Sequence, residues 1–415
     1  MDYFNYRGND LYAEDILVKD LALKYGTPLY VYSKATLVRH VKAFDEALKS
    51  RCHRICYAVK ANSNLAILNL MAKMGLGFDI VSEGELRRVI AAGGDPHKCV
   101  YSGVGKTPDE IRFALQVGVD CLNIESEAES FVISKVAKEL DVVAKVALRV
   151  NPNVDAKTLP AISTGLKNNK FGIAHEDAIR IYKRMALDPN LKIIGIDCHI
   201  GSQMTSGTPI VEATLKLLEI YNALKDLGIE IEHIDLGGGL GVIYDDETPP
   251  TPEAYFAAVS EQLGDIDVAL YVEPGRAMVA NAGILLTKVQ YQKTNGNRNF
   301  AIVDGAMNDL IRPALYGSWM NIINAQKREG VLSKFDIVGP VCESDDFLGK
   351  DRSLNIEDGD VLVVRGAGAY GSSMASNYNS RRLPCEVMVD GDKSYVIRAR
   401  QNYNDIWKDE NILPN

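Results

Sequence analysis

The sequence has no long hydrophobic run, no block of like charges, and no low-complexity tract or fixed-period repeat. No apolar run reaches the roughly 18 residues that a membrane helix requires. The first ten residues, MDYFNYRGND, lack the basic region and the apolar core of a secretory signal. The formal net charge of −9 argues against a nucleic-acid-binding surface. We therefore expect a cytoplasmic protein that binds neither membranes nor nucleic acid.

Cysteine is sparse and irregularly placed. The seven cysteines are odd in number and scattered, which does not suit a disulfide framework and does suit a reducing compartment. Cys52 and Cys56 lie close together, but no second ligand pair completes a metal site. We expect these two residues to be small buried side chains, and we expect no bound metal.

The chain does show a regular alternation of short β-branched runs and longer segments with helical periodicity. At 415 residues it is long enough for two domains. Eight candidate strands fall at residues 54–59, 77–81, 99–102, 121–124, 143–150, 191–200, 231–236 and 267–273. Each is followed by a helical segment, except possibly the last, so the pattern predicts a (β/α)8 TIM-type barrel. A doubly wound parallel sheet is the competing architecture.

The helical signal fades after residue 276, where alternating runs are punctuated by Gly, Asp and Asn. This pattern predicts a second, all-β domain with a sandwich-like or barrel-like form over residues 277–415. The run TPLYVYS at 27–33 resembles a strand that precedes the barrel. We therefore expect residues 1–33 to pair with the β domain and residues 34–276 to form the barrel.

Chemically distinctive residues recur where the predicted strands end. Catalytic groups in such barrels lie at the C-terminal ends of the strands. The residues concerned are Lys60, Asp79, Arg149, His199, Gly237–Gly239 and Glu273. Six such coincidences at one rim favour a functional site over chance placement.

The run DLGGGLG at 235–241 is the feature whose chemical role is easiest to infer. Consecutive glycines let backbone N–H groups approach an anion, and loops after the seventh strand of such barrels commonly hold phosphate. A tight turn is the structural alternative. His199 and Ser202, in HIGSQ, add a ring that could stack and a hydroxyl donor. Glu273 and Arg276, in EPGR, could instead form a surface ion pair, and Lys60 could extend into solvent.

Taken together, these residues indicate one cofactor. A lysine can form a Schiff base with an aldehyde, a glycine-rich loop can hold a phosphate, and a carboxylate can keep a pyridine nitrogen protonated. The set therefore predicts a pyridoxal phosphate site, in which the amine of Lys60 is bound to the cofactor.

The motifs YAVKAN, FDIVSEGEL, HIGSQ, GGGLG, EPGR, CESDD and GAGAYGSSMASNYNSR occur in this order along nearly the whole chain. Together they resemble the pyridoxal phosphate-dependent amino-acid decarboxylases of the barrel fold, and most closely the diaminopimelate decarboxylases. The resemblance implies a carboxy-lyase of lysine biosynthesis that works as a homodimer with shared active sites.

The resemblance also implies roles for individual residues. Lys60 would bind the cofactor aldehyde, Glu273 the pyridine nitrogen, and His199 the ring face. The phosphate would be held by Ser202, Gly237, Gly238, Gly239, Gly275 and Arg276, with Asp79 and Arg149 in support. Cys342 would be the catalytic acid, donated with Glu343 by the partner chain. The substrate would contact Arg276, Arg312, Tyr316, Glu343 and Tyr370, and Tyr370 would also lie over the cofactor.

Two positions depart from the family pattern. Leu159 and Ala161 flank a proline where many members carry His and an aromatic residue, and Gly-Ser-Trp follows Tyr316 where Tyr before a His is expected. These departures concern loop motion and fine specificity rather than the type of reaction.

The charges of the substrate pocket favour one substrate. Meso-diaminopimelate ends in a zwitterion, for which Arg276, Arg312 and Tyr316 offer partners to the carboxylate. Glu343 offers an anion to the ammonium. We therefore expect decarboxylation of meso-diaminopimelate at its D-centre to give L-lysine. The alternatives are a polyamine-pathway decarboxylase acting on ornithine, arginine or carboxynorspermidine, an inactive relative that binds the cofactor, and a barrel that binds another phosphate ester.

Overall fold

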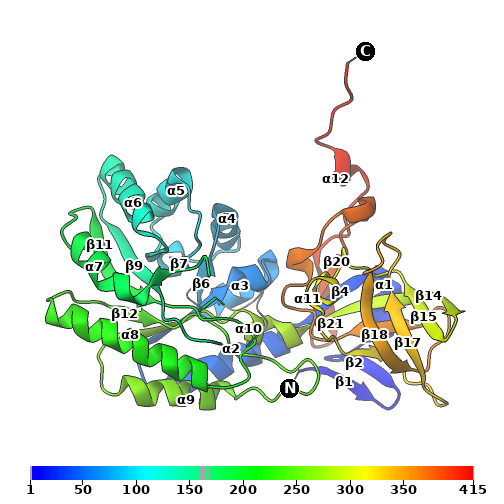
Figure 1. Ribbon diagram of the computed structural model, residues 1–415. Helices are drawn as coiled ribbons and strands as arrows, with labels where there is room; N and C mark the ends of the chain where they lie inside the picture. The colour runs from blue at the N-terminus through cyan, green and yellow to red at the C-terminus, as the bar shows by residue number, and fades with distance from the viewer. Residues whose placement is uncertain (1, 157, 159–163, 166–168, 415) are drawn as a thin grey trace. The chain divides into compact units, whose positions relative to one another are not determined.

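The computed structural model describes residues 2–414 except 157, 159–163 and 166–168. Leu159 and Ala161 lie outside the described residues. The chain divides into two compact units (Figure 1). The barrel unit comprises His40–Ile243 and Glu247–Met278, and the β unit comprises Met1–Arg39, Tyr244–Asp246 and Val279–Asn415. Each unit is described below by itself.

Eight parallel strands close into a barrel in the first unit. The strand order is β9-β11-β12-β13-β5-β6-β7-β8, and β8 pairs in turn with β9, where Ile124 lies opposite Leu148. The strands are β5 (His53–Ala58), β6 (Gly77–Ile80), β7 (Cys99–Tyr101), β8 (Cys121–Ile124), β9 (Ala144–Asn151), β11 (Leu191–Asp197), β12 (His233–Asp235) and β13 (Ala269–Val272). Because the sheet closes on itself, the predicted barrel is confirmed and the open, doubly wound sheet is excluded.

Helices cover the outside of this barrel (Figure 1). They are α3 (Leu65–Lys73), α4 (Glu83–Ala91), α5 (Pro108–Val117), α6 (Glu127–Leu140), α7 (His175–Met185), α8 (Thr208–Asp226) and α9 (Pro252–Leu263). Two further helices, α2 (Lys34–Leu48) and α10 (Arg276–Val279), carry the chain between the units. Local signals fix several of these ends. At α5, for example, Thr107 and Glu110 form a capping box and Gly118 ends the helix in the left-handed conformation.

Small shifts separate the predicted and observed strand ends. Strand β11 ends at Asp197, so His199 lies in the loop that follows and does not end the strand. Lys60 lies in a short 3-10 turn, Val59–Ala61, just after β5. The prediction that Cys52 is buried is wrong, because Cys52 precedes β5 and is exposed, whereas Cys56 lies inside the strand and is buried.

The β unit is built on a mostly antiparallel sheet of order β18-β17-β15-β14-β4-β20-β21. Its strands are β4 (Leu29–Ser33), β14 (Gly283–Asn295), β15 (Arg298–Val303), β17 (Ser333–Val338), β18 (Phe347–Leu354), β20 (Cys385–Asp390) and β21 (Lys393–Arg398). Strand β19 (Val361–Val364) pairs with β14 and with β16 (Ile322–Asn324). Strand β4 comes from the N-terminal part of the chain, pairing antiparallel with β14 and parallel with β20.

Shorter elements complete the β unit. A small sheet of β1 (Phe4–Arg7), β2 (Asp10–Ala13) and β3 (Ile16–Leu17) is followed by α1 (Val18–Tyr25). Apolar side chains from these elements, from β4 and from β20 form one buried core. Helix α11 (Arg312–Tyr316) lies between β15 and β16 in the sequence, and α12 (Asn404–Trp407) follows β21.

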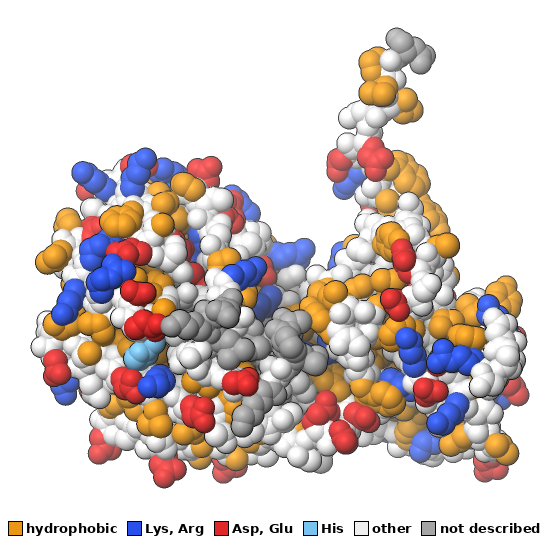
Figure 2. Space-filling model, in the orientation of Figure 1, with side chains coloured by type: hydrophobic (Ala, Val, Ile, Leu, Met, Phe, Trp, Pro, Cys, Tyr) orange, Lys and Arg blue, Asp and Glu red, His pale blue; other side chains and the backbone are white. Residues whose placement is uncertain are grey.

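The surface shows mixed charges on the barrel unit and exposed apolar side chains near the C-terminus. On the face drawn in Figure 2, positive and negative side chains are interspersed over the helices of the barrel unit. The C-terminal segment that contains α12 extends away from the rest of the β unit (Figure 1) and exposes Tyr403, Trp407, Ile412 and Leu413. Among the described residues, no helix combines the length and the apolar character needed to cross a membrane.

Candidate active site at the rim of the barrel

A lysine–aspartate pair lies where β5 and β6 end. The Nζ atom of Lys60 is 2.6 Å from Oδ2 of Asp79, whose side chain is completely buried. Ala58 is the register partner of Asp79, so pairing of the two strands brings Lys60 to this carboxylate. The other oxygen of Asp79, Oδ1, has no hydrogen-bond partner among the described residues. The ammonium at the end of this apolar strand is therefore paired, which offsets the cost of its partial burial.

Three buried carboxyl groups gather at the ends of the neighbouring strands. Asp197 ends β11, Asp235 ends β12 and Glu273 directly follows β13. One oxygen atom from each lies within 4.8 Å of the others, and Asp197 and Asp235 are register partners. The sequence analysis identified Glu273 but missed Asp197 and Asp235, although an acidic residue at the end of each apolar run, GID and HID, was the available signal.

Burial and mutual repulsion determine the protonation of this carboxyl cluster. The pKa of Asp235 is raised to about 7 mainly by burial, against the lowering effect of the hydrogen bond from Gly237 and with a further contribution from nearby Asp79. Burial also raises the pKa values of Asp197 and Glu273 well above the usual range of carboxyl groups, and neighbouring carboxylates reinforce both shifts. Like charges this close cannot all be ionised in a buried site, so the cluster shares at least one proton at neutral pH.

The glycine run forms a tight cradle beside His199. The backbone N–H of Gly237 donates to Asp235 Oδ1 at 2.8 Å, and that of Gly238 donates to His199 Nδ1 at 3.1 Å. A side chain at Gly238 would lie 2.4 Å from the carbonyl oxygen of Glu273, and one at Gly239 would lie 2.2 Å from Met204 Cε. Glycine is therefore required here by close approach as well as by the positive φ of Gly237 and Gly239.

His199 is neutral in this setting. Burial lowers the pKa of its imidazole well below the usual value, and the nearby charges of Lys60 and Arg149 lower it further. A neutral ring is also required by the geometry, because Nδ1 accepts the hydrogen bond from Gly238. The half-buried, uncharged ring is suited to stacking on an aromatic ligand rather than to pairing with an anion.

Arg276 and Ser202 meet below the EPGR turn. The Nε and Nη2 atoms of Arg276 lie 3.2 and 3.1 Å from Ser202 Oγ, and Arg276 is 7% exposed. A side chain at Gly275 would lie 3.1 Å from the Cβ atoms of Ala58 and Ala61, so this turn packs on the turn that carries Lys60. The surface ion pair considered as an alternative for this motif is therefore wrong, since Arg276 and Glu273 are both buried.

Arg149 belongs to a second buried network. Its Nη1 atom lies 2.8 Å from Oε1 of Glu125, which also accepts a hydrogen bond from the backbone of Gly103. The second oxygen of Glu125 accepts from the backbone of Gly172 at 3.0 Å. Glu125 thus ties Arg149 to two loops of the barrel unit. It was missed in the sequence because it follows β8 without a distinctive motif.

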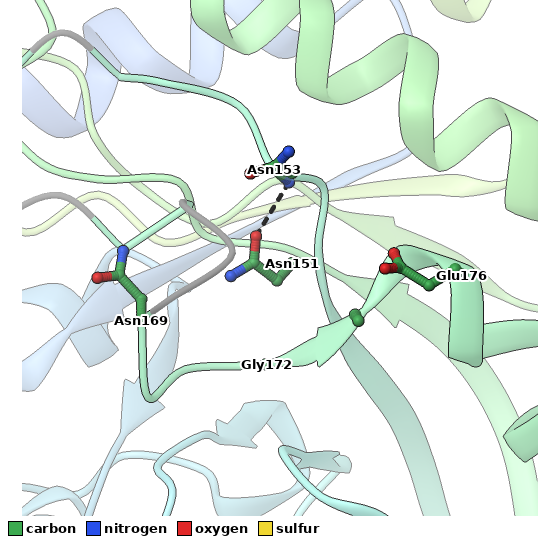
Figure 3. A pocket seen from close by; sticks show the side chains of 6 residues that line it. Asn151, Asn153, Asn169, Gly172 and Glu176 are labelled. Carbon is green, nitrogen blue, oxygen red and sulfur yellow. Dashed lines mark hydrogen bonds between the residues drawn. The ribbon is translucent and has the colours of Figure 1, made fainter.

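A polar pocket of about 260 Å³ opens beside this network (Figure 3). Its lining residues come from the end of β9, from the short strand β10 (Ile173–Ala174) and its approach, and from the start of α7. They are Asn151, Asn153, Asn169, Gly172, Ala174 and Glu176. Asn151 Oδ1 accepts a hydrogen bond from the backbone N–H of Asn153 at 3.0 Å, and Asn153 adopts a positive φ. None of these six residues was predicted to form part of the site.

The remaining predicted residues belong to the β unit. Arg312 is buried at the start of α11, and Tyr316 is the half-buried last residue of that helix. Cys342 and Glu343 are exposed, the former donating its backbone N–H to Asn379 Oδ1 at 2.9 Å and the latter accepting a hydrogen bond from the Tyr378 hydroxyl. Tyr370 adopts a φ of +54°, which is uncommon for an aromatic residue and marks a constrained loop.

The residues of the barrel rim fit pyridoxal phosphate. The glycine cradle offers a space that any Cβ atom would fill, and Arg276 and Ser202 lie on the same βα rim. Oε1 of Glu273 is buried and has no hydrogen-bond partner in the part of the chain that the structure describes, so it offers an acceptor to a ring nitrogen, and Lys60 offers a primary amine. These groups match the phosphate, the pyridine nitrogen and the aldehyde of the cofactor.

Comparison with known proteins decides the family. A model of the pyridoxal binding domain of the pyridoxal-dependent decarboxylases matches residues 34–280. Diaminopimelate decarboxylase of Vibrio cholerae is 55% identical over the full length of both chains. The chain belongs to the diaminopimelate decarboxylase family. The protein is therefore a carboxy-lyase that depends on pyridoxal phosphate, and the predicted family, enzyme class and cofactor are confirmed.

Solved structures of the family agree with this fold. Diaminopimelate decarboxylase from M. jannaschii, in a co-complex with L-lysine, is 38% identical with a TM-score of 0.95, and the match covers 100% of this chain and 98% of the other. The enzyme from Helicobacter pylori, complexed with L-lysine, is 42% identical with a TM-score of 0.92 and coverage of 94% and 98%. The likeness extends through both units.

Proposed function

We infer that the protein decarboxylates meso-diaminopimelate at its D-centre to give L-lysine and CO2, the last step of lysine biosynthesis. The observation that carries this inference is the 55% identity to a diaminopimelate decarboxylase over the whole chain. The gathering of an amine, a buried carboxyl group and a glycine cradle at one rim of the barrel supports it.

We propose that the residues of the rim hold the cofactor as follows. Lys60 binds the aldehyde carbon, Glu273 the pyridine nitrogen, and His199 the ring face. Ser202, Gly237, Gly238, Gly239, Gly275 and Arg276 hold the phosphate. Asp79 and Arg149 support the site, Asp79 by fixing the amine of Lys60 at 2.6 Å and Arg149 through its pair with Glu125.

When bound, pyridoxal phosphate supplies an electron sink for the electron pair left at Cα by loss of CO2. Glu273 keeps the proton between its carboxyl group and the ring nitrogen, and the buried site strengthens this interaction. A carboxyl group beside the ring nitrogen of the bound cofactor would keep that nitrogen protonated, which favours decarboxylation over racemisation. Cys342 delivers the proton that Cα needs after CO2 leaves.

The substrate is held at its distal end by charge. Arg276, Arg312 and Tyr316 bind the distal carboxylate, Glu343 binds the distal ammonium, and Tyr370 closes over substrate and cofactor. A guanidinium group suits this task because its fork of N–H donors matches a carboxylate in bidentate fashion.

We propose that the enzyme is a cytoplasmic homodimer in which Cys342 and Glu343 act in the partner's site. Two observations support the dimer. Both residues are exposed within their own chain, where a catalytic acid would be open to water. The C-terminal segment exposes Trp407, Ile412 and Leu413, an apolar set that is typical of a contact surface. We also propose that residues 34–276 and 277–415 act as the two domains, with residues 1–33 attached to the second.

The function is tested by incubating the purified protein with pyridoxal phosphate and meso-diaminopimelate and measuring L-lysine and CO2. L-Ornithine, L-arginine and carboxynorspermidine are assayed in parallel. We expect equal amounts of lysine and CO2 from diaminopimelate and little CO2 from the other three. A higher kcat/KM for any of those three would overturn the assignment of substrate.

A further inference from the structure

Arg312 lies among aromatic and sulfur atoms within the β unit, and we call Arg312, Tyr244 and Met320 the Arg312 cluster. Its guanidinium carbon is 4.5 Å from the centroid of the Tyr244 ring, and its Nη1 atom is 3.3 Å from the sulfur of Met320. Arg312, Tyr244 and Met320 are all buried. The ring and the sulfur are both favourable neighbours for a guanidinium group.

The backbone beside the Arg312 cluster holds Tyr244 in place. Gly366 has a φ of +67°, and a side chain there would lie 3.0 Å from Cδ1 and Cε1 of the Tyr244 ring. The glycine therefore lets the main chain pack closely on the ring. Any larger residue at 366 would push the ring away from this position.

One pair of strands positions residues on both sides of the Arg312 cluster, Met320 and Gly366. Ile322 of β16 pairs with Val364 of β19, and the backbone N–H of Arg365 donates to the carbonyl of Asn321 at 2.8 Å. Met320 directly precedes this ladder on one strand, and Gly366 directly follows it on the other. The sulfur beside Arg312 and the glycine behind Tyr244 thus come from the same end of a hydrogen-bonded pair.

A second stack anchors Met320. The guanidinium carbon of Arg352 lies 3.2 Å from the centroid of the Trp319 ring, and its Nη2 atom donates to the carbonyl of Met320 at 3.1 Å. Trp319 belongs to the Gly-Ser-Trp stretch that departs from the family pattern after Tyr316. The departure therefore coincides with a packing role, since it supplies the ring on which Arg352 rests.

We propose that Tyr244 is a positioning residue for Arg312, which it orients toward the distal carboxylate of the substrate through the contact between its ring and the guanidinium group. This inference rests on the proposed function, which gives Arg312 its contact with substrate. The ring limits the orientations open to the guanidinium group, and a bidentate carboxylate must approach in the plane of that group. Tyr244 thereby contributes to specificity without itself contacting the substrate.

The test compares two ligands that differ by one carboxylate. L-Lysine retains the distal carboxylate, whereas 1,5-diaminopentane is lysine without it. For Tyr244→Leu we expect the dissociation constant of L-lysine from the loaded enzyme to rise by about five- to thirtyfold, with that of 1,5-diaminopentane changing by less than about twofold. Tyr244→Phe keeps the ring and should restore lysine binding to within about twofold of the wild type.

Tyr403→Leu is the matched control. Its ring lies 4.7 Å from the guanidinium carbon of Arg382, a similar stack in the same unit that does not involve Arg312. This variant should bind both ligands as the wild type does. Adding Tyr244→Leu to Arg312→Ala should cause no further loss of lysine binding, because the two residues act through one contact.

Several outcomes would overturn the inference: equal weakening of both ligands by Tyr244→Leu, no weakening of either, no rescue by Phe, or an equal effect of Tyr403→Leu. If urea unfolding shows that Tyr244→Leu does not fold, Met320→Leu replaces it. That variant keeps the volume and removes the sulfur contact, so lysine should again weaken more than the diamine. If Tyr244→Leu weakened lysine binding as expected but the wild type released no CO2 from diaminopimelate, only the proposed function would be refuted.

Discussion

At the rim of the barrel unit three buried carboxyl groups lie within reach of one another, whereas in the β unit the buried arginines Arg312 and Arg352 lie against rings, sulfur and carbonyl oxygens. At the rim, Asp197, Asp235 and Glu273 crowd together, and a proton relieves their repulsion. In the β unit, Arg312 and Arg352 rest on Tyr244 and Trp319. The difference follows from chemistry, because a carboxyl group can neutralise itself by protonation and a guanidinium group cannot.

The contrast suits two different tasks. A cluster that exchanges protons can adjust its charge to a ligand whose ring nitrogen carries a proton. A guanidinium group beside an aromatic ring stays charged over the whole physiological pH range. Burial lowers the pKa of Arg352 only to about 10, so even this buried arginine remains charged near neutrality.

The largest effect is expected at Lys60. Lys60→Arg keeps a cation opposite Asp79 but removes the primary amine, so turnover should fall by about three orders of magnitude or more. Borohydride reduction of the holoenzyme, followed by peptide mapping, should label the Lys60 peptide in the wild type and leave the variant unlabelled. Lys192→Arg, at the surface pair with Glu232, is the control and should behave as the wild type. A labelled peptide in Lys60→Arg would assign the attachment to another residue.

The next effect concerns the charge of the cluster. Glu273→Gln should lower turnover by about two to three orders of magnitude, because an amide cannot keep the adjacent ring nitrogen protonated. The visible absorbance of bound cofactor should persist, which separates this loss from failure to bind. Glu232→Gln at the surface provides the control. Near-normal turnover of Glu273→Gln would show that the rim does not act through this carboxyl group.

The proton held by the carboxyl cluster should make the free energy of unfolding depend on pH. The pKa of Asp235 is about 7 in the folded protein and roughly 3.9 in an unfolded chain. The folded state therefore binds more protons in this window, and the free energy of unfolding falls as pH rises from about 4 to about 7. In Asp235→Asn, the cofactor-free protein should lose less stability than the wild type between about pH 5 and about pH 8.

Urea unfolding at several pH values measures this difference. Exposed Asp265 supplies a control, since Asp265→Asn should retain the pH dependence of the wild type. If Asp235→Asn and the wild type showed parallel stability curves, the cluster would hold no extra proton at Asp235, and the contrast between the two units would disappear.

The smallest effect is expected in the β unit. Trp319→Leu removes the ring beneath Arg352 and should lower the free energy of unfolding by about 1 to 2 kcal/mol. The chain contains two tryptophans, and the other one, Trp407, lies in the exposed C-terminal segment. Because Trp407 belongs to the proposed contact surface, the control is instead Tyr291→Leu, at an exposed ring of β14. Equal losses from the two substitutions would mean that the Arg352 stack contributes nothing measurable.

The parts of the fold that depend on local pattern were predictable. Periodicity identified eight strands and the loss of helical signal after residue 276, because strand and helix periods are properties of neighbouring residues. The approximate strand ends placed Lys60, His199 and Glu273 near one rim. The burial of Cys52 was predicted wrongly because it was inferred from residue type alone, whereas Cys52 precedes β5 and its side chain is exposed.

Partners that come from distant segments could not be predicted. Glu125 is separated from Gly172 by a long stretch of chain, and the pairing of β9 with both β8 and β10 brings them together. Tyr244 follows the glycine run and resembles an ordinary loop residue, yet it packs with α11 and Gly366 of the β unit. Such contacts depend on tertiary packing, for which the local sequence carries no signal.

Closure of the barrel has a consequence for how the enzyme matures. Strand β13 pairs with β5, with Val272 opposite Ile55, so the first and last strands of the barrel are neighbours. Lys60 leaves the ribosome long before Glu273 does. A nascent chain therefore exposes its reactive amine well before the carboxyl group that accompanies it exists, and productive loading of the cofactor must wait until the last strand has been inserted.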